Sequence, residues 1–109
     1  MIQFYKQKGG EFVKEKEIEL KDTIEGMQSD DYKERFVAEY EQVCIRIKKL
    51  ERFIGKIKYA KYADVEEPKH DCPLDLLQKQ LFSMYVYRLI LETRAEEFEH
   101  IELPKILGD

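Results

Sequence analysis

Two stretches of apolar residues, spaced alternately three and four positions apart, constrain the fold of this chain more than any other feature. The first stretch begins at Phe36 and ends at Ile57, and the second begins at Leu74 and ends at Phe98. This spacing places the apolar side chains in one stripe along an α-helix and is typical of helices that pack side by side, as in coiled coils. The first stripe contains Phe36, Tyr40, Val43, Ile47, Leu50, Ile54 and Ile57, and the second contains Leu74, Leu77, Leu81, Met84, Arg88, Leu91, Ala95 and Phe98.

Capping residues and a proline set the expected ends of the two helices. Asp31 is placed to cap the first helix, which we expect over about 31–62. Pro73 suits the first position of a helix because its missing N–H would have no partner there, and Cys72 then becomes the N-cap. The second helix is therefore predicted over about 73–101.

The two predicted helices are joined by a short polar connection that contains Pro68. A connection of about ten residues makes neighbouring helices antiparallel, so we expect a helical hairpin. The register of this hairpin pairs Phe36 with Phe98, Ile47 with Tyr87, and Ile57 with Leu77. Cys44 and Cys72 then lie too far apart along the hairpin for a disulfide.

The rest of the chain adds little to the predicted domain. Residues 1–20 alternate weakly between polar and apolar around Gly9 and Gly10, which favours a small β-hairpin or an extended segment. A chain of 109 residues with 43% hydrophobic residues is expected to be one mainly α-helical domain. We divide it into an N-terminal segment (1–28), the helical hairpin (29–103) and a tail (104–109).

The second predicted helix is apolar around most of its circumference. Between Leu81 and Leu91, nine of eleven residues are apolar, so one partner helix cannot cover them all. We therefore expect a homo-oligomer in which second helices pack together into a helical bundle. The alternative is a monomer whose N-terminal segment covers this face. Arg88, inside the stripe, is expected to reach solvent or to pair with a carboxylate, or else to act at a subunit interface.

Composition and motifs exclude several classes of protein. The net charge of −4 argues against a general DNA-binding protein, and two cysteines are too few for a disulfide framework. We therefore expect a cytoplasmic protein, without a membrane span because the longest apolar run is too short. The only histidines, His70 and His100, form neither a catalytic pair nor a zinc cluster with other residues. We expect no enzymatic activity, no metal and no cofactor.

Charge is distributed unevenly along the predicted hairpin. From Arg46 to Lys61 seven cations face a single anion, whereas carboxylates gather at the opposite end. One interpretation is that these cations only offset the helix dipole and keep the protein soluble. The other is a binding site in which lysines hold phosphates and tyrosines stack on a base. Its candidate ligand-binding residues are Lys56, Lys58, Tyr59, Lys61, Tyr62, Lys69, His70 and Arg88.

Several motifs carry a resemblance to a known family. The segments "SDDYKERF", "KLERFI" and "CP" before the second helix resemble short proteins encoded by gut bacteriophages and prophages, related to a protein of a crAss-like phage. The resemblance covers about residues 20–103. It implies an uncharacterised helical-hairpin protein of the anti-defence or host-takeover type, acting in the host bacterial cytoplasm.

These observations lead to one main hypothesis and two alternatives. The main hypothesis is a non-catalytic homo-oligomer that binds and sequesters a cyclic nucleotide or related anionic signal of bacterial immunity. The first alternative is a protein–protein inhibitor, similar to an anti-CRISPR, whose acidic end binds a host defence nuclease. The second is a component of the virion.

Overall fold

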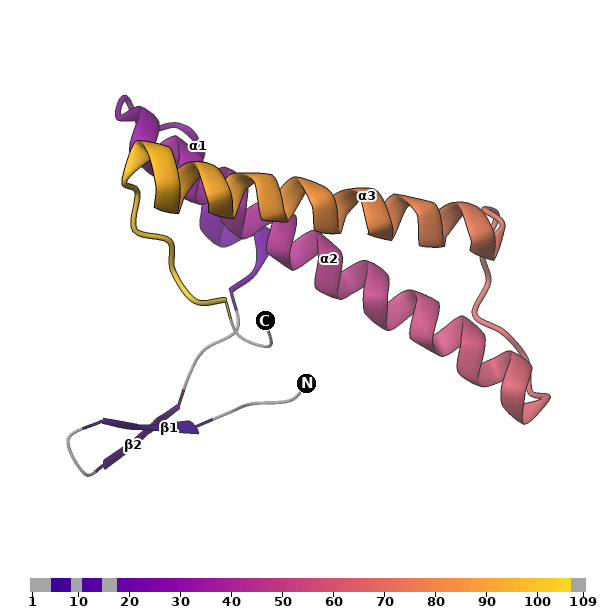
Figure 1. Cartoon of the computed structure of the whole chain (residues 1–109). Coiled ribbons are helices and arrows are strands. Elements are labelled where there is room, and N and C mark those ends of the chain that lie inside the picture. Colours follow the sequence, from indigo (N-terminus) through magenta and orange to yellow (C-terminus); the bar gives the residue numbers. More distant parts are fainter. Residues whose placement is uncertain (1–4, 9–10, 15–17, 107–109) are drawn as a thin grey trace.

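The computed structural model describes residues 5–8, 11–14 and 18–106, and two long helices dominate it (Figure 1). The mainly α-helical fold is confirmed. In chain order the elements are β1 (Tyr5–Lys8), β2 (Glu11–Lys14), a 3₁₀ turn (Leu20–Thr23), α1 (Ile24–Met27), α2 (Tyr32–Ala63), α3 (Leu74–Thr93) and a π-helical turn (Arg94–Glu99).

Both ends of α2 lie within one residue of their expected positions. At the first end the Asp31 side chain accepts a hydrogen bond from the Lys33 backbone N–H at 3.0 Å, which satisfies a donor without a partner in the helix. At the second end Asp64 adopts the left-handed conformation, with φ of 55°, and the Val65 N–H returns to the Ala60 carbonyl. This geometry stops the helix and turns the chain toward α3.

Helix α3 begins and ends differently from the prediction. Pro73 has an extended backbone and serves as the N-cap, so the helix starts at Leu74 rather than at Pro73. At the other end the α-helix stops at Thr93, and the chain continues to Glu99 as a wider π-helical turn. The predicted single α-helix over 73–101 is therefore wrong in its last turns.

The π-helical turn displaces Phe98 from the helix interface. A π-helix advances by a smaller angle per residue than an α-helix, so a residue near its end no longer follows the apolar stripe. Phe98 is 74% exposed, so it does not take the place in the core beside Phe36 that the stripe predicts. Instead the Arg94 guanidinium lies 4.8 Å from the centre of the Phe36 ring, and Ala95 is fully buried beside it.

Three tyrosine–glutamate hydrogen bonds connect the long helices. Tyr40 on α2 donates to Glu92 at 2.7 Å, while Tyr85 and Tyr87 on α3 donate to Glu51 and Glu39 of α2. Burial, together with the bond to Glu92, raises the pKa of the Tyr40 hydroxyl. These bonds set the antiparallel register and fix the rotation of α3 about its own axis.

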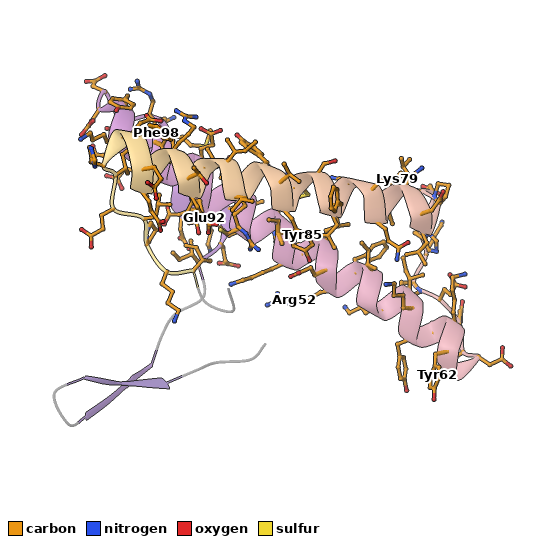
Figure 2. All side chains as sticks on the ribbon, viewed as in Figure 1. Arg52, Tyr62, Lys79, Tyr85, Glu92 and Phe98 are labelled. Carbon is orange, nitrogen blue, oxygen red and sulfur yellow. The ribbon has the colours of Figure 1, made fainter. Side chains whose placement is uncertain are left out.

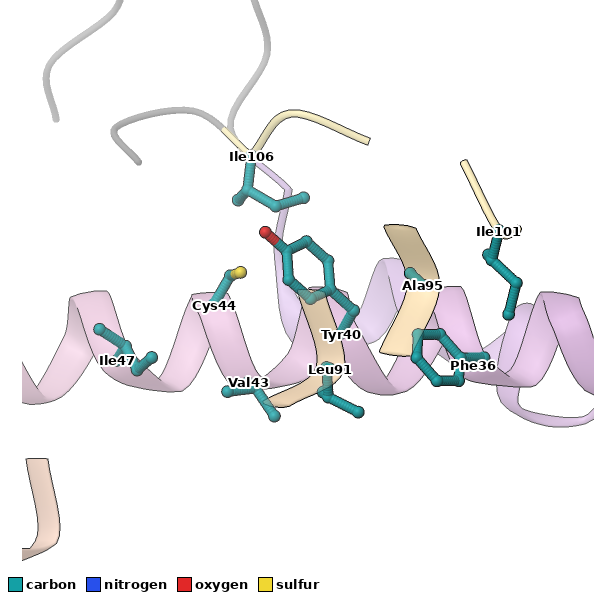
Figure 3. Close-up of a cluster of buried hydrophobic side chains, with 9 residues drawn as sticks. All are labelled: Phe36, Tyr40, Val43, Cys44, Ile47, Leu91, Ala95, Ile101 and Ile106. Atoms are coloured by element: carbon teal, nitrogen blue, oxygen red, sulfur yellow. The ribbon is translucent and has the colours of Figure 1, made fainter. Parts of the chain in front are cut away.

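The hydrophobic core surrounds the N-terminal half of α2 (Figure 3). Leu91 of α3 and Ala95 of the π-helical turn cover one side, and Ile101 and Ile106 of the C-terminal segment cover another. A third side is covered by α1, where a Cβ on Gly26 would approach the Ala38 Cβ to 3.1 Å. The buried cluster contains Phe36, Tyr40, Val43, Cys44, Ile47, Leu91, Ala95, Ile101 and Ile106.

The N-terminal strands stand apart from the helices. β1 and β2 pair antiparallel with Tyr5 opposite Lys14 and Lys8 opposite Glu11. Within the described ranges they contact each other and no helix. The expected turn at Gly9 and Gly10 lies outside the described residues.

Two further observations concern cysteines and hydropathy. Both cysteines are free, with Cys44 buried and Cys72 exposed, as the predicted distance between them requires. Among the described residues, no helix combines the length and hydropathy of a membrane span.

Ile47 provides a test of the core because its side chain is fully buried between the helices. We predict that Ile47→Ala lowers the free energy of unfolding by about 2–5 kcal/mol, because it removes buried methyl groups and leaves a cavity. The matched control is Ile24→Ala, at a position that is 53% exposed, which should cost less than about 0.5 kcal/mol. Urea unfolding followed by circular dichroism measures both values, and equal losses would contradict this description of the core.

Candidate functional site

The C-terminal half of α2 presents two unusually exposed tyrosines. Tyr59 is 67% exposed and Tyr62 is 91% exposed. They lie one turn apart on the face opposite the buried Ile54 and Ile57, and Tyr62 projects away from α3 (Figure 2). Large aromatic side chains bury much apolar area when they find a partner, so their exposure marks this face as a candidate binding surface.

Two of the predicted lysines belong to the same surface. Lys56 and Lys58 are exposed on the turns that carry Tyr59 and Tyr62, and we call these four residues the α2 patch. Among the described residues, no hydrogen bond or ion pair engages either lysine. Their ammonium groups therefore remain available to an anion.

Two of the other predicted cations near this end, Lys61 and His70, are held by Glu67 in the connecting loop. Its carboxylate accepts from Lys61 Nζ at 3.0 Å and lies 3.1 Å from Nε2 of His70. The second ring nitrogen of His70 lies 2.8 Å from the Cys72 carbonyl, and the ring packs edge-on against Phe53. Lys61 and His70 thus fix the loop against α2, and Lys69 is an exposed residue of the same loop.

The contacts of Glu67 and His70 shift both pKa values in the direction of an ion pair. The Cys72 carbonyl, and then Glu67, raise the pKa of His70 above its ordinary value of 6.5. His70 and then Lys61 lower the pKa of Glu67 below its ordinary value of 4.5. Both side chains are therefore charged around the midpoint of that range.

Arg88 does not join the other predicted site residues. It lies on α3 with its guanidinium 5.5 Å from the centre of the Tyr85 ring. In the observed register this position faces the middle of α2, about 15 Å along the helix from Lys56 at 1.5 Å per residue. Seven of the eight predicted residues thus gather at one end of the hairpin, and Arg88 is separate.

A cationic cleft lies between the helices, outside the predicted site. It has a volume of about 300 Å³ and is lined by one residue of the 3₁₀ turn, three of α2 and two of α3. Arg46 and Lys49 supply its charge, Leu50 and Met84 its apolar wall, and Gln80 a side-chain amide. We call this the cationic cleft.

An acidic cleft lies at the opposite end of the hairpin. It has a volume of about 700 Å³ and is formed by α1, the start of α2 and the segment after the π-helical turn. Burial, and then the nearby charge of Asp22, raise the pKa of Glu41 in its wall. The carboxylates that line this cleft are Asp22, Glu25, Glu34, Glu41 and Glu102.

Sequence reasoning missed Glu67 and both clefts. The spacing of Glu67 and His70, three residues apart, was the only local signal for their contact. Each cleft is lined by segments far apart in the chain, so helical periodicity alone cannot reveal it. Within the described part of the chain, no cluster of three or more potential metal ligands occurs.

The Glu67–His70 contact predicts a pH dependence. A raised His70 pKa stabilises the fold below 6.5 and loses this effect as the pH rises through the folded-state value. A lowered Glu67 pKa stabilises the fold above 4.5 and loses it as the pH falls through its own folded-state value. The contact should therefore be strongest between these two ordinary values.

Glu67→Gln should lower the pKa of His70 toward its ordinary value, as measured by an NMR titration of the ring. The adjacent exposed carboxylate provides the control, because Glu66→Gln should leave the titration unchanged. An unchanged midpoint in Glu67→Gln would show that the carbonyl of Cys72 alone causes the rise.

Comparisons with known proteins identify the family. No curated protein and no solved structure matches the chain. A family model described as Sequestin matches residues 30–97, which is well over half of the chain. The match includes α2, the connecting loop with Glu67, and α3. This chain is a member of the Sequestin family.

Proposed function

We propose that this protein is a non-catalytic binding protein that sequesters an anionic, nucleotide-type signal of bacterial immunity. It acts as a homo-oligomer, as a phage-type accessory protein in the host cytoplasm. The name of the family fits a sequestering role, and the resemblance to phage-encoded proteins supports the setting. The ligand is assigned to the α2 patch.

The observation that carries this proposal is the pairing of exposed aromatic rings with free cations. Tyr59 and Tyr62 are the two most exposed tyrosines of α2 and α3, and Lys56 and Lys58 stand beside them. Stacking on a base and neutralisation of a phosphate are the two interactions that a nucleotide requires from a protein surface. The α2 patch offers both within three helical turns.

The state of His70 favours binding over catalysis at this end of the hairpin. A general base needs a ring nitrogen that reaches the proton it removes. Both ring nitrogens of His70 already contact protein groups, the Cys72 carbonyl and the Glu67 carboxylate. We therefore assign His70 a positioning role in the loop, where its charge adds to the field at the patch.

Tyr59→Ser combined with Tyr62→Ser tests the assignment. Loss of stacking on one base should weaken binding by about 5- to 150-fold, because each base–aromatic contact contributes about 1–3 kcal/mol. The assay is titration calorimetry with cyclic dinucleotides, cyclic trinucleotides and ADP-ribose derivatives. Tyr32→Ser is the matched control, since Tyr32 is a 48% exposed tyrosine at the other end of α2.

A second double variant separates the patch from the cationic cleft. Arg46→Glu with Lys49→Glu reverses the charge of the cleft and leaves both tyrosines in place. Loss of binding in this variant alone would move the ligand to the cleft. Absence of heat across the whole panel with the unaltered protein would reject the sequestering function for nucleotides.

The acidic cleft supports a second function, inhibition of a host defence nuclease by mimicry of nucleic acid. Its five carboxylates line one surface large enough for basic side chains of a partner. Glu92 is a poor position for testing this function, because it accepts the partly buried hydrogen bond from Tyr40. Glu25 and Glu34 are exposed residues of the cleft.

Glu25→Lys with Glu34→Lys should abolish binding of an arginine-rich peptide and leave nucleotide binding unchanged, because like charges then meet in the cleft. Fluorescence anisotropy of the labelled peptide measures the effect. The control is Glu66→Lys with Asp75→Lys, two exposed carboxylates outside the cleft whose reversal changes the net charge by the same amount. Equal losses in both variants would indicate attraction by net charge alone.

A further inference from the structure

One face of α3 is apolar, exposed and continuous. The side chains of Val86, Leu89 and Ile90 follow Phe82 and Val86 at steps of three and four residues, so all four lie on one side of the helix. Their exposed fractions are 68% for Phe82, 42% for Val86, 61% for Leu89 and 51% for Ile90. We call these four residues the α3 face.

The rest of the described chain packs elsewhere. α1 and the 3₁₀ turn pack on α2, and Ile101 and Ile106 of the C-terminal segment also join the α2 core. The three tyrosine–glutamate bonds fix α3 with Leu91 inward, so its opposite side must face outward. A monomer would need its N-terminal segment to pack on the α3 face. Among the described residues of that segment, none of the helices or strands contacts α3.

The exposed area of the α3 face can be compared with the area that one partner buries in a stable protein–protein interface. The four exposed side chains present on the order of 400 Å² of apolar surface, within the range of the largest patch that a monomeric protein leaves uncovered. A stable interface buries about 800 Å² on each partner, including a polar rim. The face with its flanking residues reaches this range, whereas a small ligand would cover only part of it.

Charges at the two ends of the α3 face have opposite signs. Lys79 lies on the same side of α3, three residues before Phe82, and Glu97 follows α3 in the π-helical turn at its other end. Figure 2 shows Lys79 at the loop end of α3 and Phe98 at the opposite end. A parallel pair of α3 helices would bring like charges together, whereas an antiparallel pair centred on Val86 sets Lys79 of each copy opposite position 93 of the other, about one helical turn from Glu97.

We propose that a second copy of this chain docks on the α3 face in antiparallel orientation, with the two-fold axis at Val86. This inference deepens the homo-oligomer of the proposed function and names its interface. Val86 lies midway along the chain between the apolar residues Phe82 and Ile90. In the proposed dimer it therefore faces Val86 of the second copy across the axis. The polarity of the whole hairpin agrees, because the basic end of one copy then lies beside the acidic end of the other.

The arrangement gives each dimer two separate ligand sites. The α2 patch lies at the loop end of the hairpin and on the side of α2 away from α3. Across an antiparallel dimer the two patches are then roughly 40 Å apart at 1.5 Å per residue. Each patch therefore binds its own ligand, with one ligand per chain, and the copies do not share a pocket.

Disulfide trapping tests the orientation. In a Cys72→Ser background, which removes the exposed native thiol, Val86→Cys should form an intermolecular disulfide under mild oxidation. Lys79→Cys, on the same side of α3, should not, because its copy lies about 20 Å away along the helix in the antiparallel dimer. Disulfides in both variants would establish a parallel pair and overturn the orientation. No disulfide in Val86→Cys, together with a monomer in sedimentation, would overturn the docking itself.

A charge exchange provides the second measurement. Lys79→Glu and Glu97→Lys should each weaken dimerisation, by about 2- to 30-fold over the two symmetric contacts. The double variant should restore the dissociation constant to within about threefold of the original, because both pairs are re-formed with signs reversed. Additive losses in the double variant would place these residues apart and contradict the antiparallel arrangement.

These experiments separate the interface from the ligand. A dimer trapped at Val86 without any nucleotide binding would reject the sequestering function and retain the interface. Nucleotide binding by a protein that sediments as a monomer, with no trapped disulfide, would reject the interface and retain the sequestering function. The stoichiometry of a saturating titration adds a third check, since one ligand per dimer would contradict two separate sites.

Discussion

The burial of the N-terminal half of α2 on three sides is the constraint on which the rest of the structure depends. α3, α1 and the C-terminal segment all close on this half, and the packing is tight enough that α1 needs Gly26 beside Ala38. The C-terminal half has a narrower buried stripe, at Ile54, Ile57 and Ala60. Its outer face is consequently free to carry the exposed lysines and tyrosines of the α2 patch.

The rotation of α3 follows from this core. A helix that is apolar around most of its circumference has no strong preference for one face, since several rotations would bury similar areas. The hydrogen bonds from Tyr40, Tyr85 and Tyr87 to glutamates of the opposite helix remove that ambiguity. These bonds lie on both sides of the interface between α2 and α3. They therefore determine which apolar side chains of α3 remain exposed.

The sequence predicts α2 and α3 well because their periodic apolar residues and their caps agree. It fails at Phe98, where the helix widens into a π-helical turn that the three-and-four spacing does not encode. The tyrosines and lysines of the α2 patch are recognisable in the sequence, since they share a helix. The ion pairs of Glu67 and the two clefts depend on tertiary contacts, which helical spacing does not encode. Arg88 lies apart from the α2 patch, with its guanidinium 5.5 Å from the centre of the Tyr85 ring.

An anion-binding role is compatible with a net charge of −4 because the charges are separated. At physiological ionic strength the Debye length is about 8 Å, whereas the 32 residues of α2 span roughly 48 Å. A phosphate at Tyr62 therefore experiences the local lysines and little of the acidic cleft. In the antiparallel dimer the acidic end of the partner approaches α3, and the thickness of two helices, each about 10 Å, separates it from the patch on the far side of α2. The same separation of charge that orients the dimer thus leaves the positive surface accessible.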